Sequence, residues 1–234
     1  MLHATGVDAA LLERLWTRAD DVIASGVMLK PGDRCTVVRL DLPQANALPA
    51  PGAASKGDQP RHLTLKRYNL KGRLHTAIHL PLRSRAQWSW LSGRRLVAAG
   101  VATPMPLACV EERQCGILRL RSYLLHEFVP GRSLLDLVQS DDVTGEPLAD
   151  LAKQFARMWQ TLGQLRAGHG DMKATNFIVD PHGKLWLIDL DGLRVYRSGA
   201  LLRRERRIDL ARFMRNWQDS PEAAAVFRAR IGTG

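Results

Sequence analysis

One stretch, HGDMKATNFIVDPHGKLWLIDLDG (residues 169–192), constrains the fold more than any other part of the sequence. Two short apolar runs, FIV and LWLI, flank the sequence DPHG, which has Asp, Pro and Gly where a tight turn needs them. The pattern predicts an antiparallel hairpin. Such a hairpin would bring Asp189, after its second strand, back beside Asn176, before its first. Asp171 lies five residues upstream of Asn176, in the loop that leads into the hairpin.

Side-chain oxygens placed in this way point to phosphoryl transfer. A carboxylate beside an amide oxygen suits Mg²⁺, which takes few protein ligands because it keeps waters and phosphate oxygens. We therefore expect Asn176 and Asp189 to hold Mg²⁺, with Asp171 facing a substrate hydroxyl and Lys173 neutralising the phosphoryl group in transfer. Each residue taken singly has an ordinary explanation, since a lone HxD is common and Asp189 could cap a turn. Together they predict catalysis with ATP and Mg²⁺.

Composition limits the class of protein without naming a function. The formal net charge of +11 implies an anionic partner such as phosphate, nucleic acid or a membrane surface. Cys35, Cys109 and Cys115 are odd in number and lack CxxC spacing, which favours thiols in a reducing compartment over a disulfide framework or a zinc site. The sequence has neither a secretory signal pattern nor an apolar run of about 18 residues. We expect a cytoplasmic protein.

Hydrophobic periodicity predicts mixed helix and strand along the chain. Residues 41–60 are rich in Pro, Gly, Ala and Ser and are expected to form a flexible insertion. Gly100 and Gly168 are expected to end two of the helices. The predicted helices cover residues 8–24, 83–99 and 148–167, with a shorter one within 130–138, and the predicted strands cover residues 35–40, 62–68, 116–120 and 122–129.

The motif around Asp171 resembles the protein-kinase catalytic loop, H-R-D-x-x-x-x-N, as His169-Gly170-Asp171 through Asn176. Asp189 stands where the aspartate of D-F-G is expected, although the triplet here reads Asp-Leu-Asp. Further stretches, LTLKRY, AAGVATPMPLA, YLLHEFVPGRSLLDLV and RRIDLARF, are similar to the lipopolysaccharide kinase family, whose members phosphorylate Kdo or heptose sugars of the inner core. The resemblance covers roughly residues 60–215.

The resemblance implies an α+β, protein-kinase-like two-lobed fold over residues 1–234. The N-terminal lobe would span about 1–125, and a reduced C-terminal lobe about 126–234. ATP would donate its γ-phosphoryl group to a hydroxyl of an inner-core sugar. The acceptor would be an anionic glycolipid or sugar, and the protein would make peripheral contact with the cytoplasmic face of the inner membrane.

The same resemblance implies roles for residues outside the hairpin. Lys66 would hold the α- and β-phosphates, and the backbone from Glu127 to Val129 would receive adenine. Asp209 would brace the catalytic loop from a helix. For Lys66 the alternative is a solvated strand residue, because alternation within the strand leaves its direction ambiguous.

Two departures from the kinase pattern keep other functions open. Residues 67–110 contain no Asp or Glu, so Gln87 or Ser89 stands where a kinase helix supplies the glutamate that pairs with the strand lysine. Gly26 and Gly32 do not form a G-x-G-x-x-G motif. The alternatives are a Ser/Thr protein kinase, a small-molecule phosphotransferase, or a catalytically silent kinase-like binding module.

The basic runs have two interpretations. The sequence RRERR (residues 203–207) and the acid-free segment can form an ordinary solvated surface, or they can attract an acceptor on an anionic membrane face. Nucleic acid is the less favoured partner, because the helical spacing of Trp88 and Trp90 favours packing over base stacking.

Overall fold

The computed structural model describes residues 2–3, 7–42, 61–69, 83–114 and 118–231. They form two compact units, one of Met1–Arg94 with Met105–Phe128 and one of Arg95–Pro104 with Val129–Gly234. Each unit is described by itself below. Cys115 and all but the first two residues of the predicted insertion lie outside the described residues.

The first unit contains an antiparallel six-stranded sheet with the order β1-β5-β6-β4-β3-β2. The strands predicted over 35–40 and 62–68 are confirmed as β3 and β4. The two runs predicted as separate strands over 116–120 and 122–129 are one continuous strand, β6, and the sequence patterns did not predict β2 or β5. The strands are β1 Leu2–His3, β2 Val27–Lys30, β3 Cys35–Leu42, β4 Arg61–Tyr68, β5 Pro106–Gln114 and β6 Leu118–Glu127.

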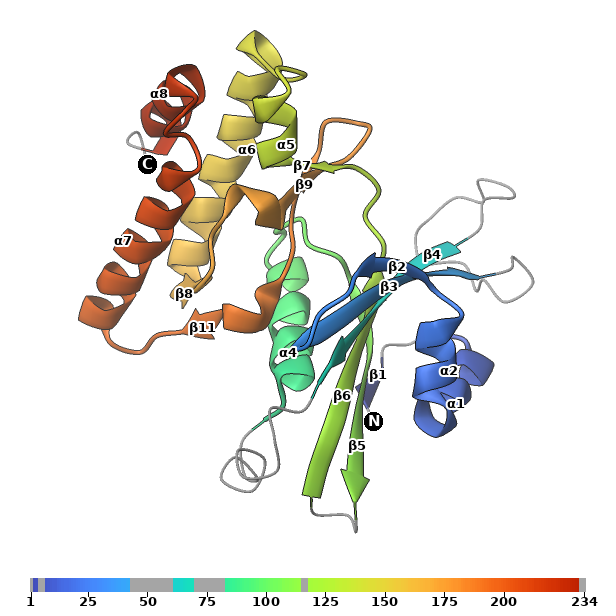
Figure 1. Cartoon of the computed structure of the whole chain (residues 1–234). Coiled ribbons are helices and arrows are strands. Elements are labelled where there is room, and N and C mark those ends of the chain that lie inside the picture. Colours follow the sequence, from blue (N-terminus) through green and yellow to red (C-terminus); the bar gives the residue numbers. More distant parts are fainter. Residues whose placement is uncertain (1, 4–6, 43–60, 70–82, 115–117, 232–234) are drawn as a thin grey trace. The chain divides into compact units, whose positions relative to one another are not determined.

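Helices pack on both faces of this sheet (Figure 1). The helix predicted over 8–24 is in fact two helices, α1 (Ala9–Thr17) and α2 (Ala19–Ala24), because the backbone of Arg18 (φ −143°, ψ 49°) leaves the helical region. Their buried residues, Leu11, Leu12, Leu15, Ala19, Val22 and Ile23, share a core with Val38, Leu65 and Leu125 of the sheet. Trp16 of α1 lies outside this core, with 58% of its surface exposed.

The predicted basic helix is confirmed as α4 (Arg85–Ala98). Its residues Ala86 and Trp90 pack against Tyr68 and Leu124, on the sheet face opposite to α1 and α2. Opposite faces follow from strand alternation, since Leu124 belongs to this cluster and its neighbour Leu125 to the other. Gly100 ends the helical segment with φ +77°, as expected for a residue after a helix C-terminus.

The second unit is built around an aromatic core. Phe155 of α6 stacks on Phe213 of α7 with 4.0 Å between ring centroids, and Phe177, Trp217 and Phe227 surround the pair. The buried face predicted for residues 148–167 is confirmed, although the helix ends at Gln164. The helices are α5 Leu134–Gln139, α6 Gly145–Gln164, α7 Gly199–Arg215 and α8 Pro221–Ile231; the strands are β7 Arg132–Ser133, β8 Ala167–Gly168, β9 Phe177–Val179, β10 Leu185–Leu187 and β11 Arg194–Val195.

A glycine allows the chain after Val129 to pack closely against the three-stranded sheet of order β10-β9-β7. Gly131 has φ +143°, and a Cβ atom there would lie 2.1 Å from the carbonyl oxygen of Val179. The next residue, Arg132, pairs with Val179. The chain can therefore approach β9 closely only because residue 131 has no side chain. Within the described part of the chain, no helix is both long and apolar enough to cross a bilayer.

Candidate active site

The predicted hairpin is present as β9 and β10, with Phe177 opposite Leu187. Asp180 stabilises its turn, since its side chain accepts hydrogen bonds from the backbone N–H groups of His182 (2.9 Å) and Lys184 (3.0 Å). At the open end, the N–H of Ile188 donates to the carbonyl of Asn176 at 2.9 Å. Asp189 therefore follows the residue that is hydrogen-bonded to Asn176, as the sequence predicted.

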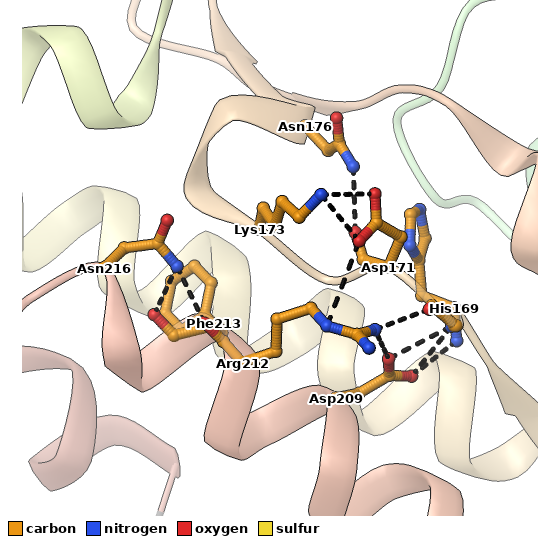
Figure 2. A network of polar contacts seen from close by, with 9 residues as sticks. His169, Asp171, Lys173, Asn176, Asp209, Arg212, Phe213 and Asn216 are labelled. Atoms are coloured by element: carbon orange, nitrogen blue, oxygen red, sulfur yellow. Dashed lines mark hydrogen bonds and ion pairs between the residues drawn. The ribbon is translucent and has the colours of Figure 1, made fainter. Parts of the chain in front are cut away.

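Asn176 and Asp189 have local geometry that fits a cation site. The Nδ2 of Asn176 donates to the carbonyl of Asp171 at 2.8 Å, and its Oδ1 points away from that loop (Figure 2). Asp189 adopts a left-handed backbone (φ 58°, ψ 63°), which Asp tolerates better than most residues and which is frequent at functional sites. No cluster of three or more His, Cys, Asp or Glu occurs among the described residues. A cation here would combine the side-chain oxygens of these two residues with phosphate and water oxygens, a donor set that Mg²⁺ accepts.

Asp171 and Lys173 form a close pair in the loop before the hairpin. The Nζ of Lys173 lies 2.9 Å from each carboxylate oxygen of Asp171. Both side chains are partly open to solvent, with 40% of the Asp171 side chain exposed. Backbone hydrogen bonds from Lys173 N to Asp171 O (3.0 Å) and from Asn176 N to Lys173 O (2.9 Å) hold the loop compact.

Asp209 of α7 is fully buried and holds the start of this loop. Its carboxylate accepts hydrogen bonds from the backbone N–H of His169 at 2.6 Å and of Gly170 at 3.0 Å (Figure 2). These two donors would otherwise be buried without partners, which is energetically costly. The contacts are those of a residue that braces the loop.

Arg212 is a residue of this site that the sequence reasoning missed. Its guanidinium donates to the carbonyl of Gly170 at 2.5 Å and lies 3.8 Å from Asp209 and 3.9 Å from Asp171 (Figure 2). The available signal was the loop itself, because Gly170 stands where the H-R-D pattern has arginine. An arginine from α7, three residues after Asp209, contacts the loop instead.

Glycine and a buried histidine bring the loop against the segment after the hairpin. Gly170 has φ +79°, and a Cβ atom there would meet the carbonyl oxygen of Gly192 at 2.7 Å. His169 is fully buried, and burial lowers the pKa of its imidazole while nearby Asp209 opposes the shift. Its Nε2 lies 3.3 Å from the carbonyl oxygen of Ile188, so a neutral ring protonated at Nε2 donates to the chain just before Asp189.

Lys66 lies in the first unit, on β4 between Val37 of β3 and Leu124 of β6. Strand alternation places it on the same sheet face as Tyr68, which packs against α4, so its direction is no longer ambiguous. Its Nζ is 5.1 Å from the centroid of the Tyr68 ring. Within this unit Lys66 therefore faces α4.

Neither Gln87 nor Ser89 reproduces the charge of a kinase glutamate, but Ser89 makes a hydrogen bond close to Lys66. Ser89 is buried and accepts a hydrogen bond from the hydroxyl of Tyr68 at 3.3 Å. The guanidinium of Arg85 lies 4.9 Å from the centroid of the same ring. Tyr68 thus contacts a cation of β4 and a cation of α4.

The backbone of Glu127, proposed from the resemblance to receive adenine with Val129, ends β6. Its N–H donates to the carbonyl of Met105 at 3.1 Å, and its carbonyl lies 2.8 Å from Nδ1 of His126. The division between the two units falls between Phe128 and Val129. Val129 therefore begins the longer segment of the second unit.

The turn between β2 and β3 contains Gly32, in the segment where the sequence did not locate a phosphate-covering turn. Residues 31–34 connect the two strands. The Nδ2 of Asn69, just after β4, donates to the carbonyls of Gly32 and Asp33, both at 3.1 Å. This amide anchors the turn to the end of the strand that carries Lys66.

The two basic segments are not uniform charged surfaces. In RRERR, Arg206 stacks over the Trp159 ring at 3.7 Å and donates to the Trp159 carbonyl at 3.0 Å, and burial lowers the pKa of its guanidinium. The Cβ of a side chain at residue 163 would meet this guanidinium at 3.1 Å, so Gly163 makes room for it. In the acid-free segment, Arg83 and Arg94 lie over the rings of Trp88 and Trp90.

Comparisons with known proteins agree with this geometry. A sequence model described as the lipopolysaccharide kinase (Kdo/WaaP) family matches residues 53–228. A 3-deoxy-D-manno-octulosonic acid kinase of Vibrio cholerae serotype O1 is 28% identical over 134 residues, which are 55% of this chain and 54% of that protein. A kinase of the same name from Xylella fastidiosa strain M12 is 32% identical over 123 residues, which are 53% of this chain and 46% of that protein. The chain thus spans about half the length of these curated relatives.

A solved structure supports the fold. The structure titled "WaaP in complex with acyl carrier protein" aligns with a TM-score of 0.62 and 19% identity, covering 95% of this chain and 86% of that one. The predicted α+β, protein-kinase-like fold is therefore confirmed.

Proposed function

Because the chain belongs to the lipopolysaccharide kinase (Kdo/WaaP) family, we propose that it transfers the γ-phosphoryl group of ATP to a hydroxyl of a lipopolysaccharide inner-core sugar. The observation that carries this proposal is the arrangement of the second unit, where Asp171 and Lys173 lie in the loop that Asn176 hydrogen-bonds and that precedes the hairpin ending at Asp189. The names of the curated relatives favour 3-deoxy-D-manno-octulosonic acid as the acceptor sugar over heptose.

Asp171 is the residue that accepts a hydrogen bond from the attacking hydroxyl and orients its oxygen toward the γ-phosphorus. A new sugar O–P bond forms while the bond from the γ-phosphorus to the β,γ-bridging oxygen breaks, ADP leaves, and the hydroxyl proton passes through Asp171 to solvent. Lys173, 2.9 Å from Asp171, reaches the same position and offsets negative charge on the phosphoryl group in transfer. Arg212 acts through the loop, because its contacts to Gly170 and Asp171 keep the carboxylate in place.

Asn176 and Asp189 hold Mg²⁺ in this proposal. The ion, when bound, offsets the charge of the nucleotide phosphates. Asn176 is fixed for this role by its hydrogen bond to Asp171, and Asp189 by the backbone contacts of Ile188.

Apart from Val129, the nucleotide contacts in this proposal come from the first unit. Lys66 holds the α- and β-phosphates, the backbone of Glu127 and Val129 receives adenine, and the turn over residues 31–34 covers the phosphates with backbone N–H groups. Tyr68 partly replaces the missing glutamate in positioning Lys66, because the centroid of its ring lies 5.1 Å from the Lys66 ammonium.

The acceptor sugar is part of a glycolipid in this proposal, so the protein works in peripheral contact with the cytoplasmic face of the inner membrane. A phosphorylated, carboxylate-bearing acceptor on anionic lipid also explains the formal charge of +11.

A panel of acceptors tests the proposal. The protein is incubated with ATP and Mg²⁺ and either deacylated inner-core oligosaccharide, a Ser/Thr peptide or an aminoglycoside, and the products are analysed by mass spectrometry. We expect one added phosphate on the oligosaccharide and none with Asp171→Asn. Phosphate on the peptide or aminoglycoside instead would reassign the substrate class. ATP unchanged with every acceptor would support the silent binding module.

A further inference from the structure

The outward face of α7 combines arginine with exposed apolar side chains. Leu201 and Ile208 lie seven residues apart, so they share one side of the helix, with 53% and 36% of their surfaces exposed. Arg204 lies between them on the same side. Arg203, Arg207 and Arg215 are also exposed. We call the set Leu201, Arg203, Arg204, Arg207, Ile208 and Arg215 the α7 basic face.

Neither acidic residue of α7 is fully exposed, although Glu205 follows Leu201 by one helical turn. Asp209 is fully buried at the catalytic loop, and Glu205 is half-buried against Gly168 and Tyr196. Arg206 is also turned inward, onto Trp159. Because α7 contains no other acid, arginine is the only charged residue type among its fully exposed residues.

From this arrangement we infer that the α7 basic face docks on an anionic lipid bilayer. Arginine side chains can hold their charged groups at lipid headgroups while their stems and the flanking apolar side chains enter the interface. The exposed Leu201 and Ile208 favour a bilayer over nucleic acid, since phosphodiester strands offer no apolar phase for aliphatic side chains. Leu201 and Ile208 are about 10 Å apart along the helix, and three exposed arginines lie between them in the sequence.

Docking through α7 would also orient the catalytic loop. The same helix carries Asp209 and Arg212, which contact His169, Gly170 and Asp171, and Arg212 follows Ile208 by one helical turn. A single helix thus carries both the α7 basic face and the residues that hold the loop of Asp171. The inference rests on the proposed function only in that a membrane glycolipid acceptor gives the docking its purpose.

Vesicle sedimentation of the full-length protein tests the inference. Vesicles of phosphatidylcholine alone are compared with mixed vesicles of phosphatidylcholine and phosphatidylglycerol, for the parent and the triple variant Arg203→Gln/Arg204→Gln/Arg207→Gln. We expect the parent to bind only the anionic vesicles. The triple variant should bind them about 10²-fold more weakly, which converts to somewhat under 1 kcal/mol for each arginine. The apolar variant Leu201→Ser/Ile208→Ser should weaken binding by a factor that changes little with salt, because the lost contact is not electrostatic.

A matched control removes the same charge elsewhere on the second unit. Lys153→Gln/Arg157→Gln/Arg228→Gln alters exposed cations of α6 and α8 and should retain vesicle binding. Equal losses in the control and the α7 triple variant would overturn the inference and indicate net charge as the cause. No vesicle binding by the parent would overturn it as well, and parent binding to polyuridylate alone would assign the face to nucleic acid.

Activity is measured separately, on soluble deacylated oligosaccharide. The α7 triple variant should phosphorylate this acceptor at the parent rate, since these arginines do not contact the loop. If the parent binds vesicles through α7 but phosphorylates no sugar, the docking inference stands and the proposed function fails. If the parent phosphorylates soluble sugar but the α7 variants bind vesicles like the parent, the proposed function stands and the docking inference fails.

Discussion

Replacing Asp209 by Asn tests how much the hydrogen bonds from the catalytic loop to this carboxylate contribute to stability and to turnover. The carboxylate accepts from two buried N–H groups, of His169 at 2.6 Å and of Gly170 at 3.0 Å. Hydrogen bonds to a charged group contribute about 1.5–3 kcal/mol each. Asn keeps one acceptor oxygen but turns an NH₂ group toward these donors or toward Arg212. We expect the loss of one such bond, with weaker pairing to Arg212, to lower the free energy of unfolding by about 2–4 kcal/mol.

The expected shift of Tm is a decrease of roughly 5–15 °C for a protein of this size, measured by circular dichroism at neutral pH. The control is Asp219→Asn, which changes an exposed aspartate beyond the end of the same helix and should leave Tm unchanged. We also expect kcat to fall by about 10²-fold with little change in the KM for ATP, because a small displacement of Asp171 misaligns the attacking hydroxyl. A change in unfolding free energy below about 1 kcal/mol would refute the reasoning, since two charge-assisted bonds cannot then depend on this carboxylate.

Three further predictions concern the metal, the lysine and the histidine. Asp189→Asn keeps a residue that tolerates the left-handed backbone, so Tm should be retained while Mg²⁺-dependent ATP turnover falls by about 10³-fold; normal turnover in the folded variant would remove Asp189 from the metal site. Lys66→Met should sharply lower kcat/KM for ATP, whereas Gln87→Glu should be tolerated or improve it; parent-like turnover by Lys66→Met would mean that another residue holds the phosphates. Burial lowers the pKa of His169 below the 6.5 of an exposed imidazole, so only the unfolded chain gains this proton as the pH falls from about 7 to 5. The free energy of unfolding should therefore drop by up to about 1.4 kcal/mol per pH unit over this range. In thermal melts, the stability of His169→Gln should depend less steeply on pH, and a slope equal to that of the parent would contradict the buried, neutral state of His169.

The local parts of the site were accessible from the sequence because short-range patterns determine them. The turn DPHG needs only Asp180 and Gly183 to form, and both act within the turn. Hairpin geometry then fixes the proximity of Asn176 and the residue after β10. Asp209 was reached only through the resemblance to kinases, since nothing in its local sequence marks it as buried.

Arg212 and Tyr68 escaped prediction because their partners are distant in sequence. Arg212 meets Gly170 across 42 residues, and Tyr68 meets Ser89 across 21, so only tertiary packing brings them together. Strand β5 was missed because Pro106 and the charged run from Glu111 to Arg113 obscure its alternation. The break between α1 and α2 is a change of backbone at Arg18, a residue that has no special turn propensity.

The close approach of Gly131 to β9 connects the segment that begins at Val129 directly to the hairpin of the candidate site. Val129, the residue proposed to meet the base, is two residues before Gly131, whose successor pairs with β9, and β9 begins immediately after Asn176. One small hydrogen-bonded sheet therefore connects the segment after Val129 with the segment that follows Asn176, the residue proposed to bind metal. Any side chain at 131 would push the two strands apart, since its Cβ would lie 2.1 Å from a carbonyl oxygen. If Val129 meets the base and Asn176 holds the metal, as proposed, we expect a substitution at Gly131 to disturb both positions.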